Sequence, residues 1–227
     1  MTSTGLAINR EVQIPVEDQL LEGSLIVPPG ARGLVLFAHG SGSSRHSPRN
    51  RFVAQELQRR GLGTLLMDLL TREEETVDLR TRALRFDIGL LASRLGEAAA
   101  WLRSQRQTAA LQVGCFGAST GGGAALVAAA QHPGLIHAVV SRGGRPDLAG
   151  EFLPRVQAPT LLIVGGHDSP VIRLNEEALA QLTCDKEMVI VPGATHLFEE
   201  PGTLEEVARL AGEWFVRHLG SEDSAKE

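Results

Sequence analysis

The pentapeptide G-A-S-T-G, residues 117–121, places a serine in a setting that suits nucleophilic chemistry. It follows a short apolar run at 111–116 and precedes an Ala-rich stretch, so the pattern predicts a strand, a sharp turn and then a helix. At such a turn, small flanking residues let the backbone strain and expose the Ser119 hydroxyl near the positive end of the helix dipole. The competing interpretation is a plain Gly/Ser turn, and the partners of the serine must decide between the two.

A serine hydroxyl needs a general base, and the imidazole of that base needs an acceptor that fixes its tautomer. Later in the chain, two short apolar runs each end in a residue of the required type. The run 160–164 leads into G-G-H-D, which ends in Asp168, and the run 188–191 leads into P-G-A-T-H, which ends in His196. The order serine, aspartate, histidine is the one that G-x-S-x-G hydrolases use. We therefore predict a catalytic triad of Ser119, His196 and Asp168.

Serine-based ester cleavage also requires backbone N–H groups that face the oxygen of the tetrahedral intermediate. One donor is expected from Thr120, the residue after the nucleophile. The second is expected from the loop after the strand at 34–38, which reads H-G-S-G-S-S. In that loop we choose the N–H of Ser41 as the donor.

The same loop permits a second interpretation, a dinucleotide site. Gly40 and Gly42 follow a strand, and Asp68 ends the next one, as the ribose-binding acid of a G-x-G-x-x-G motif would. The third glycine position, however, holds Arg45. The chain also lacks a Walker G-x-x-x-x-G-K-[ST] motif and an H-E-x-x-H motif, so we favour triad chemistry.

Basic residues gather after two of the predicted strands: Arg45, His46, Arg49, Arg142 and Arg145. Both loops belong to the carboxyl edge of the sheet, where ligands bind in open α/β folds. We single out Arg45 and Arg142 as residues that bind an anionic part of the substrate. In the alternative, these cations form structural ion pairs with Glu73–Glu75 and Asp147, which the arginine-rich composition makes a serious competitor.

The elements that must position these residues follow an alternating pattern. Eight segments are predicted strands: 11–16, 20–27, 34–38, 63–67, 111–116, 137–140, 160–164 and 188–191. Five stretches are predicted helices: 49–60, 84–104, 121–131, 173–182 and 204–218. The first two strands form an antiparallel hairpin, and the rest alternate with helices as in a parallel sheet covered on both faces. We expect one domain over 1–219 and a loose tail over 220–227, and we expect the Glu73–Glu75 run to be a solvated loop.

Composition narrows the class of protein. The 227 residues carry a net charge of −5, from 27 acidic and 22 basic residues, which argues against a nucleic-acid partner. The chain has neither a signal-like start nor an apolar run long enough to span a membrane, so we expect a cytoplasmic protein without a membrane partner. Cys115 and Cys184 have no metal-binding spacing, and we expect two free thiols and no metal.

Taken together, the hairpin, the H-G-S-G loop, the G-A-S-T-G turn, G-G-H-D and G-A-T-H-L-F resemble the α/β-hydrolase superfamily, and the short chain is most similar to its dienelactone-hydrolase-related branch. The resemblance covers residues 11–219. It implies an eight-stranded, mostly parallel sheet whose second strand is antiparallel, without a separate lid domain, and it places nucleophile, acid and base at Ser119, Asp168 and His196. Dienelactone hydrolases carry cysteine where this chain has Ser119, which favours an ordinary carboxylic ester as substrate.

These observations predict a serine esterase that cleaves a small carboxylic ester through an acyl-enzyme intermediate, without a cofactor. Two alternatives stay open. The same triad would support an acyltransferase or thioesterase, and the chain would also serve as a non-catalytic binding module on a hydrolase scaffold. The expected partner is a small-molecule ester, and a homodimer is compatible with the sequence.

Overall fold

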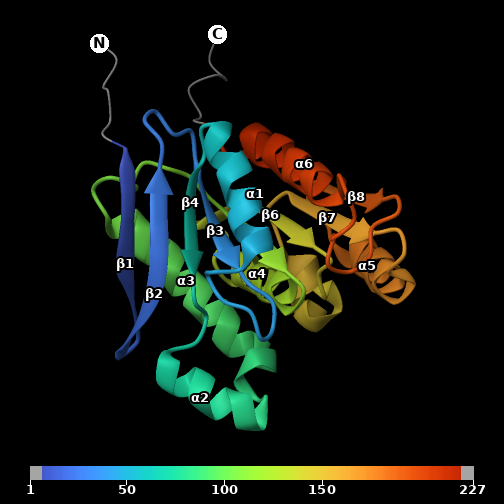
Figure 1. The fold of residues 1–227 in the computed structure, drawn as a ribbon, viewed down its shortest axis with the longest axis horizontal. Coiled ribbons are helices and arrows are strands. Elements are labelled where there is room, and N and C mark those ends of the chain that lie inside the picture. Colours follow the sequence, from blue (N-terminus) through green and yellow to red (C-terminus); the bar gives the residue numbers. More distant parts are fainter. Residues whose placement is uncertain (1–6, 221–227) are drawn as a thin grey trace.

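Eight strands form one sheet in the computed structural model, which describes residues 7–220 (Figure 1). The predicted tail therefore lies outside the described residues except for Gly220. The strands are β1 (Ile8–Val16), β2 (Gln19–Val27), β3 (Leu34–Ala38), β4 (Gly63–Met67), β5 (Val113–Ala118), β6 (Ile136–Arg142), β7 (Thr160–Gly165) and β8 (Lys186–Val191). Their order across the sheet is β1-β2-β4-β3-β5-β6-β7-β8.

Strand β2 runs in the direction opposite to that of the other seven strands of this sheet. It pairs antiparallel with β1 and with β4, whereas the pairs from β4 through β3 to β8 are all parallel. The predicted eight-stranded α/β-hydrolase sheet with an antiparallel second strand is therefore confirmed. Because the parallel strands share one direction, their carboxyl ends meet at one edge, and the loops that leave β3, β5, β6, β7 and β8 gather there.

The central strands are apolar throughout because both faces of the sheet are covered. Along β3, Leu34 and Leu36 pack in one core cluster, and Val35 and Phe37 pack in the cluster on the opposite face. All four side chains are buried. Burying one such side chain contributes about 1.5–3 kcal/mol, so two-sided burial explains why these strands read as continuous apolar runs rather than as alternating ones.

Helices cover both faces. They are α1 (Pro48–Arg59), α2 (Arg72–Thr81), α3 (Ile88–Ser104), α4 (Thr120–Gln131), α5 (Ser169–Gln181) and α6 (Thr203–His218), with short 3₁₀ segments η1 (Leu84–Phe86) and η2 (Pro146–Arg155). Helices α1 and α6 pack together over one face, and α3 and α4 pack together over the other, as Figure 1 shows. None of the helices within residues 7–220 combines the length and apolarity needed to cross a membrane.

The Glu73–Glu75 run is not a solvated loop, which corrects the prediction. It forms the first turn of α2, a helix that projects beyond the carboxyl edge of the sheet (Figure 1). The Thr71 hydroxyl accepts the N–H of Glu74, and the Glu74 carboxylate accepts the N–H of Thr71, which is a complete capping box. Three carboxylates at a helix N-terminus also interact favourably with the helix dipole.

The predicted helix over 84–104 is divided at Asp87. The Asp87 carboxylate accepts the N–H of Leu90 and so caps α3, while residues 84–86 form the separate segment η1. An aspartate at this position competes with continuous helix because its side chain offers the backbone an alternative hydrogen bond.

The turn between β5 and α4 depends on close backbone contact. A Cβ on Gly117 would lie 2.4 Å from the carbonyl oxygen of Gly121, and a Cβ on Gly121 would lie 2.3 Å from the carbonyl oxygen of Ala38. Both obstacles are backbone atoms, which cannot move aside as a flexible side chain would. The first and last glycines of the pentapeptide are therefore steric requirements of the turn.

The Gly117→Ala substitution should accordingly lower the free energy of unfolding by at least about 1–3 kcal/mol through overpacking. In a chain of this size, each kcal/mol corresponds to a fall of about 2–4 °C in Tm. Thermal unfolding followed by circular dichroism measures the effect. Gly134→Ala is the matched control, because a Cβ there meets no atom within 4 Å. An equal Tm for both variants would contradict the steric account.

Candidate active site

Ser119 occupies a strained backbone conformation at the end of β5. Its φ is 52° and its ψ is −122°, a region that costs a residue other than glycine about 1–3 kcal/mol. Three hydrogen bonds hold it there. The Ser119 N–H donates to the carbonyl oxygen of Arg142 at 3.3 Å, and the Ser119 carbonyl accepts from the N–H groups of Gly122 at 2.9 Å and Arg145 at 3.0 Å. The neighbouring strand β6 and its loop therefore fix the position of the serine.

His196 and Asp168 are brought together from the loops after β8 and β7. The Nδ1 atom of His196 lies 2.6 Å from the Oδ2 atom of Asp168, a charge-assisted hydrogen-bond distance. Asp168 stands at the N-cap of α5, but its side chain makes no capping bond and is directed to the histidine instead. This contact leaves Nε2 as the imidazole nitrogen that is able to accept a proton.

The loop that carries the histidine is anchored at its base. The His167 N–H donates to the carbonyl oxygen of Ala194 at 2.9 Å, which ties the loop after β7 to the loop after β8. Glu200 accepts both the N–H of Thr195, at 3.0 Å, and the hydroxyl of Thr195, at 2.7 Å. These hydrogen bonds lower the pKa of Glu200 below its usual range. Glu200 thus orders the segment next to His196.

Ser119 and His196 line one cavity of about 250 Å³, which we call the catalytic cavity. Its walls also include Ser41 and Ser43 of the loop after β3, and three residues with long or polar side chains: Arg49, Asn50 and Arg142. Asn50 and Arg142 are 3% and 6% exposed, respectively. The Asn50 Oδ1 atom and the Nε atoms of both arginines are buried without a hydrogen-bond partner among the described residues.

Arg142 is a buried cation without a carboxylate. Within the described part of the chain no acidic group pairs with it, and its guanidinium carbon lies 5.8 Å from the centre of the Phe198 ring. Burial, and to a smaller degree the charge of Arg49, lower the pKa of Arg142 to about 10. The group therefore keeps its charge at neutral pH, and an unpaired buried charge is costly unless a ligand completes it.

Both residues proposed for the oxyanion hole lie close together. The N–H of Ser41 donates to the Oγ1 atom of Thr120 at 3.0 Å. The N–H of Thr120 belongs to the first turn of α4, where amides have no acceptor within the helix. Gly40 packs directly on Ser119, since a Cβ there would lie 3.2 Å from the Cβ of Ser119. A substrate oxygen that reached Ser41 would have to share or replace the Thr120 hydroxyl.

His39 holds the loop after β3 in place. Its Nδ1 atom lies 2.9 Å from the carbonyl oxygen of Gly40, and its Nε2 atom accepts the N–H of Leu69 at 3.1 Å. Burial lowers the pKa of His39, which favours the neutral ring that this pair of bonds requires. The histidine thus links the loop after β3 to the loop after β4.

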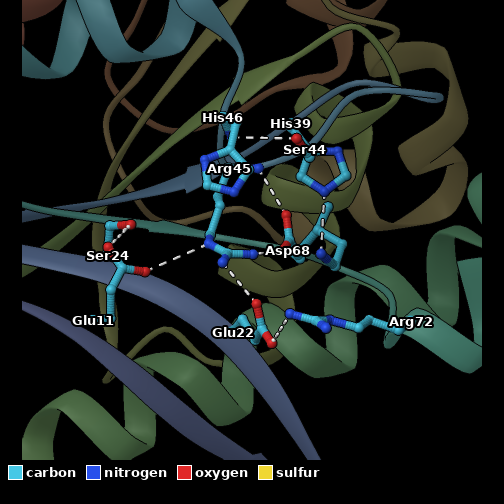
Figure 2. A network of polar contacts seen from close by, with 10 residues as sticks. Glu11, Glu22, Ser24, His39, Ser44, Arg45, His46, Asp68 and Arg72 are labelled. Carbon is cyan, nitrogen blue, oxygen red and sulfur yellow. Dashed lines mark hydrogen bonds and ion pairs between the residues drawn. The ribbon is translucent and has the colours of Figure 1, made fainter.

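Arg45 does not face the catalytic cavity, which corrects the prediction that it binds substrate. Figure 2 shows its guanidinium between the carboxylates of Glu11, Glu22 and Asp68. It pairs with Asp68 after β4, with Glu22 of β2 at 2.6 Å and with Glu11 of β1 at 3.6 Å. Burial alone would lower the pKa of Arg45, but hydrogen bonds to Asp68 and Glu22 outweigh it and raise that pKa. Arg45 is therefore a structural residue that ties the hairpin to the loop after β3.

The other two arginines of the predicted basic group, Arg145 and Arg49, also form ion pairs. Arg145 pairs with Asp147, as the ion-pair alternative expected. Arg49 pairs with Glu199 at 3.0 Å and still lines the catalytic cavity. Among the described residues, the Glu73–Glu75 run forms no ion pair with this basic group. Glu74 pairs with Arg94 of α3 instead.

Cys115 and Cys184 are free thiols in the structure. Cys115 is buried inside β5, four residues before the nucleophile, and burial raises its pKa to about 12. A thiol in that state is a poor nucleophile. The described residues contain no group of three or more His, Cys, Asp or Glu side chains placed to hold a metal ion.

Some residues of the site had no signal in the sequence analysis. Asn50 follows Arg49 at the start of α1, where one asparagine in a polar segment is unremarkable by type or spacing. Glu200 lies in the loop before α6, which begins at Thr203. Its carboxylate binds the loop before it, and such a contact is visible only when the loop is folded.

A family model described as the dienelactone hydrolase family matches residues 21–217. Among solved structures, a dienelactone hydrolase from Anabaena variabilis shares 64% identity and a TM-score of 0.92, covering 94% of this chain and 99% of its own. Est1E from Butyrivibrio proteoclasticus has a TM-score of 0.76 at 17% identity, over 91% of this chain and 98% of its own, which reflects a shared fold.

Relatives from two strains of Mycobacterium tuberculosis are 59% identical over 211 residues, and they carry the provisional name phosphoribosyl transferase. The match covers 93% of this chain but only 47% of each relative. The chain thus spans about half the length of the curated relatives that it matches.

The Arg45→Leu substitution should lower the free energy of unfolding by about 1–2 kcal/mol, because it leaves Asp68 and Glu22 partly buried without their cation. It should change kcat/KM for anionic and neutral esters by the same factor. Thermal unfolding and a pair of esters of equal size measure both effects. Arg59→Leu is the control, since Arg59 pairs with Glu56 on an exposed helix face. Selective loss of the anionic ester would return Arg45 to the substrate site.

Proposed function

The chain belongs to the dienelactone hydrolase family, and we propose that it hydrolyses a small carboxylic ester through Ser119, His196 and Asp168. One observation carries this proposal. Ser119, in a strained turn, lines the same cavity as His196, and the Nδ1 atom of His196 lies 2.6 Å from the Oδ2 atom of Asp168. The strain, the shared cavity and the oriented imidazole are the conditions that nucleophilic serine catalysis requires.

In the proposed reaction, the Oγ atom of Ser119 attacks the carbonyl carbon while Nε2 of His196 takes its proton. Asp168 holds the Nδ1–H of the imidazole and stabilises the imidazolium that forms. The C–O bond to the alcohol then breaks as His196 returns the proton to the leaving oxygen. The acyl group stays on Ser119 as an ester.

The negative charge of the tetrahedral intermediate would rest against the N–H groups of Thr120 and Ser41. The first is free at the start of α4, and the second is 3.0 Å from the Thr120 hydroxyl, which an incoming oxygen would share or displace. Donors of this kind are typically worth about 10²–10³ in kcat when one is removed.

Water would complete the cycle by attacking the acyl-enzyme, with His196 as the base. The His196 side chain is 39% exposed, so water has direct access to it.

The name of the mycobacterial relatives does not change this proposal. Their remaining length lies outside the match, and the matched half is the part that the hydrolase family model describes. The name alone therefore does not assign phosphoribosyl transfer to this chain.

We further propose that the preferred ester carries an anion that Arg142 binds. Arg142 lines the catalytic cavity, is buried, and has no carboxylate partner within residues 7–220. An arginine fork pairs with a carboxylate through two parallel hydrogen bonds, and no carboxylate of the described residues occupies that place on Arg142.

Ser119→Ala and His196→Ala should each reduce esterase activity by at least about 10³-fold while the fold is retained, because the triad acts as one unit. Turnover of a short-chain aryl ester measures the loss, and circular dichroism monitors the fold. A fluorophosphonate should label the wild-type chain at Ser119 and leave Ser119→Ala unlabelled. His167→Ala is the control, since its side chain does not line the catalytic cavity. Folded wild-type protein that resists labelling would point to a binding module.

Arg142→Leu should raise KM for an anionic ester, with a loss of about 1–3 kcal/mol that a neutral ester of equal size does not show. Paired kinetics on the two esters, with Tm alongside, test this. Arg145→Leu is the matched control, because Arg145 lies three residues away and pairs with Asp147. Equal losses on both esters would remove the anionic substrate and leave a general small-ester hydrolase.

A further inference from the structure

A second cavity, of about 180 Å³, lies on the other side of the loop after β3. Its walls combine that loop with the segment after β4 and with α2, η1 and α3. Four leucines line it: Leu69, Leu70, Leu79 and Leu91. Leu69 and Leu91 are buried, so the inner part of the cavity is apolar.

The aspartates around this cavity are already paired. The Arg85 backbone N–H donates to Oδ1 of Asp78 and the Arg85 Nε–H donates to Oδ2, and Asp68 is bound by Arg45. Glu75 also borders the cavity, where it is exposed to solvent. No buried charge is therefore left in this cavity for an ion to complete, in contrast to Arg142 in the catalytic cavity. The walls suit an uncharged group.

The size of the cavity limits that group. An apolar protein cavity of roughly 150 Å³ is sufficient to bind benzene. The second cavity is slightly larger, at about 180 Å³. It would hold one aromatic ring or a short aliphatic chain, and a long fatty chain would not fit within it.

The two cavities share one wall, the loop after β3, beside the proposed reacting centre. Both are lined by Gly40, Ser41 and Ser43. Thr120, which follows the nucleophile directly, lines the second cavity, and its hydroxyl accepts the N–H of Ser41 there. The proposed oxyanion donors thus lie at the shared wall, with Ser119 and His196 on the side of the catalytic cavity only.

The chemistry decides which part of an ester lies in which cavity. His196 has to protonate the leaving oxygen, so the alcohol must depart through the cavity that His196 lines, beside Arg142. The acyl group remains on Ser119 and lies on the opposite side of the oxyanion donors. This side is the second cavity.

We infer that the second cavity is the acyl subsite, and that the substrate is an ester of a short aliphatic or benzoic-type acid with an alcohol that carries the anion. The inference rests on the proposed function, because it takes Ser119 and His196 as nucleophile and acid. Leu79 and Leu91 are then the residues that determine acyl specificity.

The test varies the acyl group and the alcohol separately. Leu79→Trp places a bulky ring on α2 at the rim of the cavity, where Leu79 is 68% exposed and a larger side chain is tolerated by the fold. It should lower kcat/KM for 4-nitrophenyl benzoate at least about tenfold relative to 4-nitrophenyl acetate, the scale on which pockets sense small changes in size. It should leave the ranking of acetate esters of larger and smaller alcohols unchanged.

Val77→Trp is the matched control. Val77 also lies on α2 and is 52% exposed, but it does not line the cavity, so neither series should change. Leu91→Ala tests the opposite direction. By enlarging the inner cavity it should raise the ratio of hexanoate to butyrate turnover, and its Tm shows whether the fold is retained.

The inference is overturned if Leu79→Trp changes the alcohol series instead of the acyl series, or if both leucine variants keep the wild-type acyl ranking. Either result would be obtained with an enzyme that still cleaves esters and is labelled at Ser119. Failure of the proposed function is recognised separately, by a folded wild-type chain that neither turns over esters nor reacts with a fluorophosphonate.

Discussion

The geometry of the site depends on the close approach of three backbone segments at the turn after β5. Gly117, Gly121 and the end of β3 at Ala38 are so near that a single Cβ would collide with a carbonyl oxygen. This contact fixes where α4 starts, and the start of α4 fixes both the strained φ of Ser119 and the direction of the Thr120 N–H. The parallel register of β5 and β6 sets Ala118 opposite Arg142, so Arg142 is the residue of β6 that stands beside Ser119.

Arg142, that neighbouring residue, is energetically unusual. An arginine with 6% exposure and no carboxylate among the described residues is an unfavourable group in an empty site. The fold tolerates it beside a second cation, Arg49, and against the ring of Phe198. Such a charge lowers the stability of the ligand-free protein. An anion that bound there would meet a guanidinium that is already largely desolvated. Binding and stability are therefore in direct opposition at this position.

The sequence was sufficient for features that depend on local pattern. Eight apolar runs identify the strands, and because parallel strands end at one edge, Ser119, Asp168 and His196 could be predicted to lie near one another. The sequence was insufficient where the direction of a side chain decides its role. Arg45 follows β3 and Arg142 ends β6, and they have the same chemistry, but Arg45 turns toward the carboxylates of the hairpin while Arg142 lines the cavity that Ser119 lines. The helix α2 is a different case, since Thr71 and Glu74 have the spacing of a capping box that could have identified it.

The segment 71–87 is attached to the rest of the molecule in a self-contained way. It opens with the capping box of Thr71 and Glu74 and closes with Asp87, which caps the next helix. Between these ends it takes part in three ion pairs: Glu74 with Arg94 of α3, Arg72 with Glu22 of β2, and Asp78 with Arg85, the last internal to the segment. No strand of the sheet passes through it. A change within this stretch would therefore alter one wall of the second cavity, which Glu75, Asp78, Leu79 and Arg85 line, while every strand of the sheet stays as it is.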